Sequence, residues 1–227
     1  MKITYYGHSC MLVEENGVSV MIDPFLLGNP ESGLAPKDVQ VDAVILTHGH
    51  ADHFGDCIEI ARQNDCPIIA VYELAVYCAA QGVKSEGMNI GGGRQFDGFK
   101  VKFTQAFHSS SISVGDTWIY AGQPGGILLT MGDKTFYHAG DTSLFGDMRL
   151  IGEMNSIDCA ALPIGDSLTM GPEDALLAAQ WVRTKKVIPV HYNTFPEIEQ
   201  DAGAFCDRLR QTGVEGYPLK PGESIEI

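Results

Sequence analysis

The feature that most constrains this sequence is a short segment crowded with metal-binding side chains. Three histidines and one aspartate fall within six positions, in the pattern HxHxDH, at His48, His50, Asp52 and His53. The chain has only seven histidines in 227 residues, so this density is improbable by chance. Neutral imidazole and carboxylate are ligand types suited to Zn²⁺, Mn²⁺ and Fe²⁺. The segment therefore predicts a metal site where an apolar run ends and a helix begins.

Other apolar runs of strand length also end near a residue able to bind a metal ion. The runs and the residues after them are 18–22 before Asp23, 41–46 before His48, 101–107 before His108, 135–138 before Asp141, and 187–190 before His191. Alone, His108 or His191 would be interpreted as an ordinary loop histidine. Beside the HxHxDH segment, they are expected to meet it at a shared edge of the fold.

Hairpin and helix signals complete the expected secondary structure. Gly132 and Asp133 separate two apolar runs, which predicts a β-hairpin with a two-residue turn. The helical spacing of the apolar residues Phe54, Cys57, Ile58 and Ala61 predicts a first helix. Three more helices are expected, one over 72–81 that stops at Gly82, one from Pro172 to Val182, and a shorter one capped by Asp201. This order suggests two packed sheets with helices outside them.

Length and composition favour one domain over residues 1–227. No apolar run reaches the roughly 18 to 20 residues that a membrane span needs. The N-terminus alternates like a strand and lacks signal-peptide features, so a cytoplasmic location is expected. The cysteines are scattered and expected to be reduced and mostly buried, at positions 10, 57, 66, 78, 159 and 206.

The charge of the chain bears on its partners. The formal net charge is −14, with 15 lysines and arginines spread along the sequence. Proteins that bind nucleic acids or anionic membranes rely on positive patches, and none is evident here. We therefore expect a small-molecule substrate, no nucleic-acid partner and no membrane association.

Taken in order, the candidate ligands resemble the series typical of the metallo-β-lactamase superfamily. The series consists of Asp23, the HxHxDH segment at 48–53, His108, Asp141 and His191. The resemblance implies a four-layer αββα sandwich, of mixed α/β (α+β) class, with a dinuclear metal site at one edge.

The resemblance also implies a role for each ligand. It assigns His48, His50 and His108 to the first metal ion, Asp52, His53 and His191 to the second, and Asp141 to a bridge between them. Asp23 is implied to orient a ligand. A turn-forming aspartate before Pro24 is an equally good interpretation of Asp23 from the sequence alone.

A narrower resemblance runs almost from end to end. The segments Gly7-His8-Ser9, 137–142, 162–165, 169–174 and 189–194 are similar to those of the UPF0173 metal-dependent hydrolases. Relatives of that branch include the ascorbate-6-phosphate lactonases, and the branch has no agreed substrate. Metallo-β-lactamases proper carry cysteine or histidine at the position of Asp141, so this resemblance disfavours antibiotic hydrolysis.

These inferences predict a hydrolase that uses a hydroxide bound to two divalent metal ions. The pKa of water falls from about 15.7 to about 7 at well-studied zinc sites. Zinc is the expected metal, with manganese or iron as alternatives, and a small ester or lactone, an amide or a phosphodiester is the expected substrate. An iron-dependent oxidoreductase or dioxygenase on the same fold, and a non-catalytic metal-binding protein, remain open alternatives.

Several residues have less specific roles. Asp52 is a candidate to orient the nucleophile or carry a proton. His8 is a candidate substrate contact or proton shuttle, or else a cap on the first hairpin. His138 is expected to support a ligand or the fold, and the 165–171 segment to wall the site. Arg94 follows three glycines, either in an ordinary turn or in a loop that reaches an anionic substrate. By analogy with related enzymes, a homo-oligomer is also an open expectation.

Overall fold

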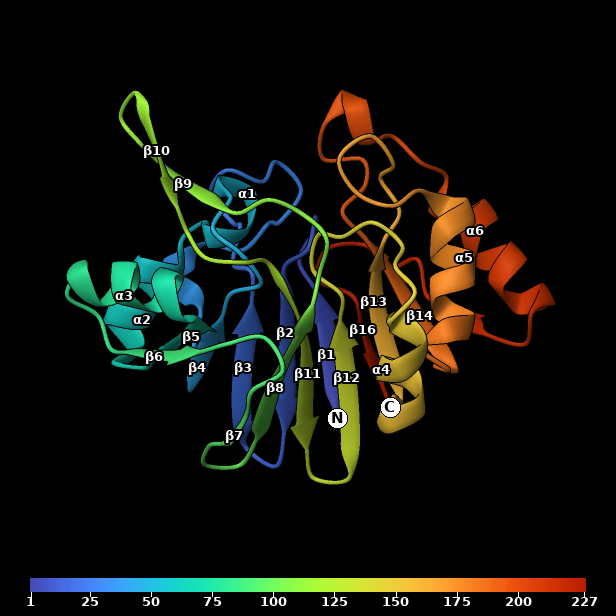
Figure 1. Cartoon of the computed structure of the whole chain (residues 1–227), viewed down its shortest axis with the longest axis horizontal. Coiled ribbons are helices and arrows are strands. Elements are labelled where there is room, and N and C mark those ends of the chain that lie inside the picture. The colour runs from blue at the N-terminus through green and yellow to red at the C-terminus, as the bar shows by residue number, and fades with distance from the viewer.

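Two seven-stranded sheets form the centre of the computed structural model, which describes residues 1–227 (Figure 1). The strands of the first sheet are β1 Lys2–Tyr5, β2 Met11–Glu15, β3 Val18–Ile22, β4 Ala43–Ile45, β5 Ile68–Val71, β6 Ser85–Met88 and β16 Ser224–Glu226. Those of the second sheet are β7 Gly93–Gln95, β8 Lys100–Gln105, β11 Gly125–Met131, β12 Lys134–His138, β13 Cys159–Pro163, β14 Lys186–Val190 and β15 Glu215–Gly216. The strand orders are β16-β1-β2-β3-β4-β5-β6 and β15-β14-β13-β12-β11-β8-β7.

Helices cover the outer face of each sheet (Figure 1). α1 Ala51–Phe54, α2 Cys57–Asn64 and α3 Tyr72–Ala80 lie beside the first sheet, whereas α4 Met148–Met154, α5 Pro172–Trp181 and α6 Ala202–Gln211 cover the second. Two short 3₁₀ turns, η1 Pro36–Asp38 and η2 Pro196–Ile198, lie in loops. The expected four-layer αββα sandwich is thereby confirmed.

The apolar residues form two cores that follow from this layering. The larger core has 41 buried residues and combines both sheets, for example Val20 of β3 with Phe103 of β8 and Phe136 of β12. The smaller has 20 buried residues and joins the outer face of the second sheet, at Leu162, to α6, at Phe205. Burial of these side chains, at roughly 25 cal/mol per Å² of apolar area, drives the layers together.

The hairpin is confirmed in register and turn. Met131 pairs with Lys134, which leaves Gly132 and Asp133 as the two turn residues. Gly132 has a φ of +59°, and the φ of Asp133 is not positive. That combination matches the hairpin turn that requires glycine at its first position.

The apolar stripe at 54–61 is not one continuous helix. α1 ends at Phe54 and α2 begins at Cys57, because Gly55 turns the chain with a φ of +43°. A Cβ atom on Gly55 would lie 2.3 Å from the carbonyl oxygen of Pro24, so only glycine fits. Asp56 then accepts hydrogen bonds from the N–H groups of Leu26 and Leu27. The break therefore anchors the loop that follows Asp23.

The strand directions place the candidate ligands at one edge. β3 runs parallel to β4, and β12 to β14 run parallel to one another. β8 and β12 are both antiparallel to β11, so these two strands share a direction. The loops with the candidate ligands follow the carboxyl ends of β4, β8, β12 and β14. These ends therefore meet at one edge, which lies at the top of Figure 1 beside α1.

Two expectations from composition can be compared with the structure. All six cysteines are buried and unpaired, as expected for small apolar side chains. None of the helices combines the length and the apolarity that crossing a membrane requires.

Candidate metal centre

Four imidazoles surround one carboxylate oxygen at this edge. The distances from histidine Nε2 atoms to Asp141 Oδ2 are 3.0 Å for His191, 3.3 Å for His53, 3.5 Å for His108 and 3.9 Å for His48. Asp141 is only 3% exposed. These side chains come from four separate segments of the chain, and they converge as a carboxylate that bridges two metal sites would require.

On one side of Asp141 lie His48, His50 and His108. Their ligand nitrogens all lie within 4.8 Å of one another. His48 Nε2 is 2.9 Å from His50 Nδ1, a separation that suits two nitrogens bound to one ion at about 2.0–2.1 Å each. His48 is fully buried, whereas His50 and His108 are half-buried. This group therefore faces the more open side of the site.

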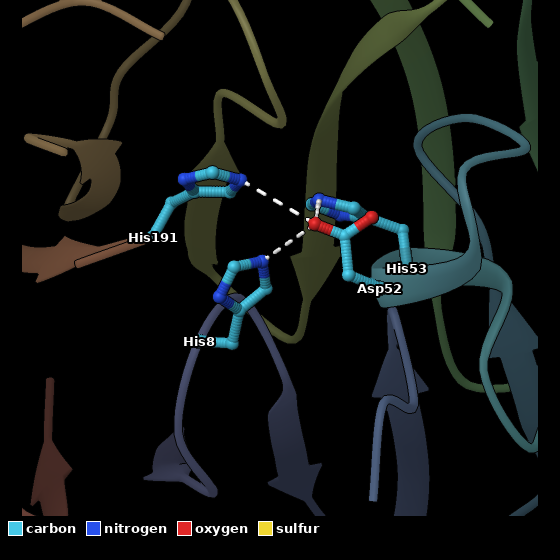
Figure 2. Close-up of side chains that lie close together, drawn as sticks. All are labelled: His8, Asp52, His53 and His191. Carbon is cyan, nitrogen blue, oxygen red and sulfur yellow. Dashed lines mark hydrogen bonds and ion pairs between the residues drawn. The ribbon is translucent and has the colours of Figure 1, made fainter. Parts of the chain in front are cut away.

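A second group, drawn in Figure 2, consists of His8, Asp52, His53 and His191. Asp52 Oδ2 lies 3.7 Å from His191 Nε2 and 3.8 Å from His53 Nε2. It lies closest, at 3.0 Å, to His8 Nε2. Asp52 is 24% exposed, so its carboxylate reaches the opening of the site.

The HxHxDH segment presents its ligands through a short extended turn. His50 has extended φ and ψ angles of −64° and 151° and immediately precedes α1. In extended chain, residues two apart point the same way, which puts His48 and His50 on one side. A Cβ on Gly49 would lie 2.6 Å from the Cβ of Ala121, so this position must be glycine. α1 then turns Asp52 and His53 back toward the same centre.

Asp23 organises two of the ligands. Its Oδ2 accepts from His53 Nδ1 at 2.7 Å and from the Thr47 hydroxyl at 2.6 Å. Because the single Thr47 hydroxyl proton goes to Asp23, Thr47 Oγ1 must accept from His48 Nδ1, 3.0 Å away. Both histidines therefore carry their proton on Nδ1 and direct an Nε2 lone pair into the site. With a φ of +48°, Asp23 also turns the chain, so both interpretations of this residue apply.

Asp23→Ala is expected to weaken metal binding about 10- to 100-fold, because His53 and His48 lose the carboxylate that orients them. Isothermal titration of the metal-free protein measures this change. Asp116→Ala, at an exposed turn, serves as the matched control and should bind like the wild type. Unchanged affinity in Asp23→Ala would contradict the orienting role.

Burial and charge act in opposite directions on the histidines. Burial lowers the pKa of His48, His50 and His108, which keeps their nitrogens unprotonated and able to bind a cation. Burial acts on His191 in the same sense, but the Asp141 carboxylate outweighs it and raises the pKa of His191 to about 9. Burial would also lower the pKa of His53, but Asp141 and Asp23 outweigh it and raise that pKa, so a cation bound at His53 Nε2 would have to displace a proton there.

The two carboxylates stay ionised despite their burial. Burial would raise the pKa of Asp141, but His191 and His53 hold it well below its usual range. The pKa of Asp52 is also lowered, because the nearby imidazoles of His191 and His8 outweigh burial. Buried anions require nearby positive charge, which bound cations would supply.

Unpartnered atoms test the fit of metal ions to this donor set. His53 Nε2 and Asp141 Oδ1 are buried and have no hydrogen-bond partner. Buried polar groups are normally paired, so two bare acceptors that face a cluster of imidazoles are unusual. The residues present thus fit divalent metal ions, in the ligand types and in the vacant lone pairs.

His138 supports the fold and does not enter the cluster. The Gly140 N–H donates to its Nδ1 at 3.1 Å, so the Nε2–H donates to the carbonyl of Ser9, 2.9 Å away. Fully buried, His138 ties the turn before Asp141 to the loop that carries His8.

The interpretation of Arg94 as a residue that reaches an anionic substrate is wrong. Arg94 lies in β7, paired with Val101 near the start of β8, whereas His108 follows the far end of that strand. Its guanidinium forms an ion pair with Glu86 at the exposed surface. The expected turn is present at Gly91 and Gly92, where Gly91 has a φ of +84° and the Gly92 N–H donates to the carbonyl of Asn89, and strand β7 begins directly after it.

The 165–171 segment adjoins the site as expected. The Met170 N–H donates to the carbonyl of Thr142, next to Asp141. A Cβ on Gly165 would lie 2.2 Å from the carbonyl oxygen of His191. This segment therefore packs against the backbone of His191 and of the residue that follows Asp141.

His8 is fully buried, and its predicted contact with substrate does not fit that burial. Sequence reasoning also missed two supporting residues of the site, Thr47, which joins Asp23 to His48, and Thr194, which contacts His8. The only available signal was their position beside His48 and shortly after His191.

Comparisons with known proteins agree with this geometry. A family model described as a beta-lactamase superfamily domain matches residues 2–191. Proteins named UPF0173 metal-dependent hydrolase from Bacillus pumilus and Bacillus cereus are 57% and 55% identical to this chain, over 100% of both partners. The solved structure of Igni18, a metallo hydrolase from Ignicoccus hospitalis, is 38% identical with a TM-score of 0.90, covering 99% of this chain and 97% of that one.

Proposed function

This chain belongs to the beta-lactamase superfamily, in its UPF0173 metal-dependent hydrolase branch, and from that premise we propose a dinuclear centre that hydrolyses a small ester or lactone, an amide or a phosphodiester. The observation that carries the proposal is the convergence of four histidine Nε2 atoms on Asp141 Oδ2, within 3.0–3.9 Å. When bound, two divalent metal ions, zinc by preference, would supply an activated hydroxide and polarise the bond under attack.

Each candidate ligand has a separate role in the proposed centre. His48, His50 and His108 would hold the first ion, and Asp52, His53 and His191 the second, with Asp141 shared between them. Asp23 holds His53 directly and His48 through Thr47. Because Asp52 is partly exposed, its carboxylate is positioned to orient the nucleophile or accept its proton.

The charge of the protein supports a small substrate. A net charge of −14 repels polyanions such as nucleic acids at long range. We therefore propose a neutral or mildly anionic small molecule as the substrate. The centre itself would be less negative once cations occupy it.

A substrate panel tests this function. Purified protein with measured metal content would be assayed against lactones, aryl esters, thioesters, amides and phosphodiesters, beside His50→Ala and the surface control Asp116→Ala. We expect hydrolysis of at least one class by wild type and control, and loss of it in His50→Ala. Activity that survives in His50→Ala would exclude this centre as its source.

The same preparation distinguishes a hydrolase from an oxidative enzyme on this fold. Protein loaded with iron under air would be monitored for oxygen consumption in the presence of each panel compound. A hydrolase leaves the oxygen concentration unchanged. Compound-dependent oxygen consumption without hydrolysis would contradict the proposal.

A further inference from the structure

His8 lies in an unusual position for a residue of an N-terminal turn. Its backbone is left-handed, with a φ of +55°, and its side chain is fully buried. Figure 2 shows its ring directed at Asp52, with Nε2 3.0 Å from Asp52 Oδ2. Its other nitrogen, Nδ1, is 2.9 Å from the hydroxyl of Thr194. Three segments that are distant in sequence thus meet through one imidazole.

The proton directions follow from what each group can donate. The Asp52 carboxylate only accepts, so His8 must carry a proton on Nε2. The ring lies between the imidazoles of His53 and His191, with centroid separations of 5.5 and 4.1 Å. With Nε2 engaged as a donor, Nδ1 is the acceptor for the Thr194 hydroxyl, whose other acceptor, the Tyr192 carbonyl, lies farther away at 3.5 Å. The chain of hydrogen bonds runs from Thr194 through His8 to Asp52.

Hydrogen bonds to its backbone and packing against its ring hold His8 in this position. The N–H of His191 donates to the carbonyl of His8 at 2.7 Å, and the Tyr5 hydroxyl reaches the same carbonyl at 3.3 Å. Phe25 and Phe195 contact the ring edge-on, with centroids 5.6 and 5.5 Å away. A side chain fixed on every side can hold the orientation of its partner.

We propose that His8 is a positioning residue that occupies one side of Asp52 Oδ2 and so fixes how this carboxylate meets the second metal ion, with Thr194 setting its tautomer. The proposal rests on the proposed dinuclear centre. In the proposed centre, Asp52, His53, His191 and Asp141 would give the second ion four protein ligands without His8, whose Nε2 is already engaged by Asp52. His8 therefore acts on Asp52 and not on the ion.

Cobalt titration of three variants tests this role. The variants are His8→Ala, His8→Gln, whose amide can donate near the former Nε2 position, and Thr194→Val. Metal-free proteins would be titrated with Co²⁺ and followed by visible absorption and calorimetry. We expect His8→Ala to weaken the second binding event about 10- to 100-fold and leave the first unchanged. We expect His8→Gln to recover most of that loss and Thr194→Val to show a smaller one. Thr117→Val, at an exposed strand, is the matched control.

Each contrary result would contradict a specific part of the proposal. If His8→Gln binds the second ion as weakly as His8→Ala and its Co²⁺ spectrum changes, His8 is itself a ligand and the positioning role is wrong. Unchanged second-site affinity in His8→Ala overturns the role altogether. A wild-type protein that binds two ions but hydrolyses nothing overturns the proposed function alone, whereas failure to bind a second ion overturns both.

Discussion

Asp141→Ala is expected to lower kcat/KM by about 10³-fold or more on any substrate that this centre hydrolyses. Asp141 Oδ2 is the atom on which four histidine nitrogens converge, so in the proposed dinuclear centre it would be the one ligand shared by both metal sites. Charge stabilisation by metal ions contributes several kcal/mol to such reactions, and about 4 kcal/mol corresponds to roughly 10³-fold in rate.

The measurement pairs steady-state kinetics with metal content. Asp141→Asn keeps the shape of the side chain and removes its charge, so it should lose activity together with the alanine variant. Asp133→Ala, in the exposed turn of the same hairpin, should behave like the wild type. Retention of near-normal kcat/KM in Asp141→Asn would mean that the bridging charge is not needed.

The part of the site that sequence could predict is the part carried by strand ends. The runs before His108 and His191 are short, apolar and followed by a metal-competent side chain, and both are strands that end at the same edge. A short apolar run of strand length identifies a buried strand, and strands that share a direction bring their carboxyl ends to the same edge. Local pattern and sheet topology therefore sufficed to gather these residues.

The contacts that sequence could not predict join segments far apart in the chain. His8 meets Asp52 across 44 positions and Thr194 across 186. Neither contact has a periodicity or spacing to reveal it, because it depends on how the first hairpin packs against the loop after β14. The residues that support the site are thus brought together by tertiary packing, which the sequence does not reveal. The candidate ligands, in contrast, follow strands that can be recognised from the local sequence.

The same distinction explains the errors in secondary structure. The stripe at 54–61 has helical spacing, but the close approach of Pro24 to Gly55 breaks the helix. The ribbon of β9 Ser111–Val114 and β10 Thr117–Tyr120 escaped detection because all of β10 is exposed and no buried face gives it an alternating pattern. Helix α6 is as long as α5, at ten residues each, although a shorter helix was expected.

Removal of bound metal ions is expected to lower the melting temperature by about 8–16 °C. Asp141 is almost fully buried, and buried carboxylates are stable only when a positive charge offsets their desolvation. Ions that bind only the native state at about 1,000 times their Kd add about 4 kcal/mol of stability. For a chain of this size, each kcal/mol shifts the melting temperature by about 2–4 °C.

Circular dichroism melts with EDTA, and again after zinc is restored, measure this shift. The wild type should regain its full melting temperature on addition of zinc. Asp141→Ala should show little difference between the two conditions, because its sites bind poorly, while Asp133→Ala should follow the wild type. Equal melting temperatures of the wild type with and without metal would show that the seven candidate ligand side chains are stable without cations, and the electrostatic argument for the centre would then be wrong.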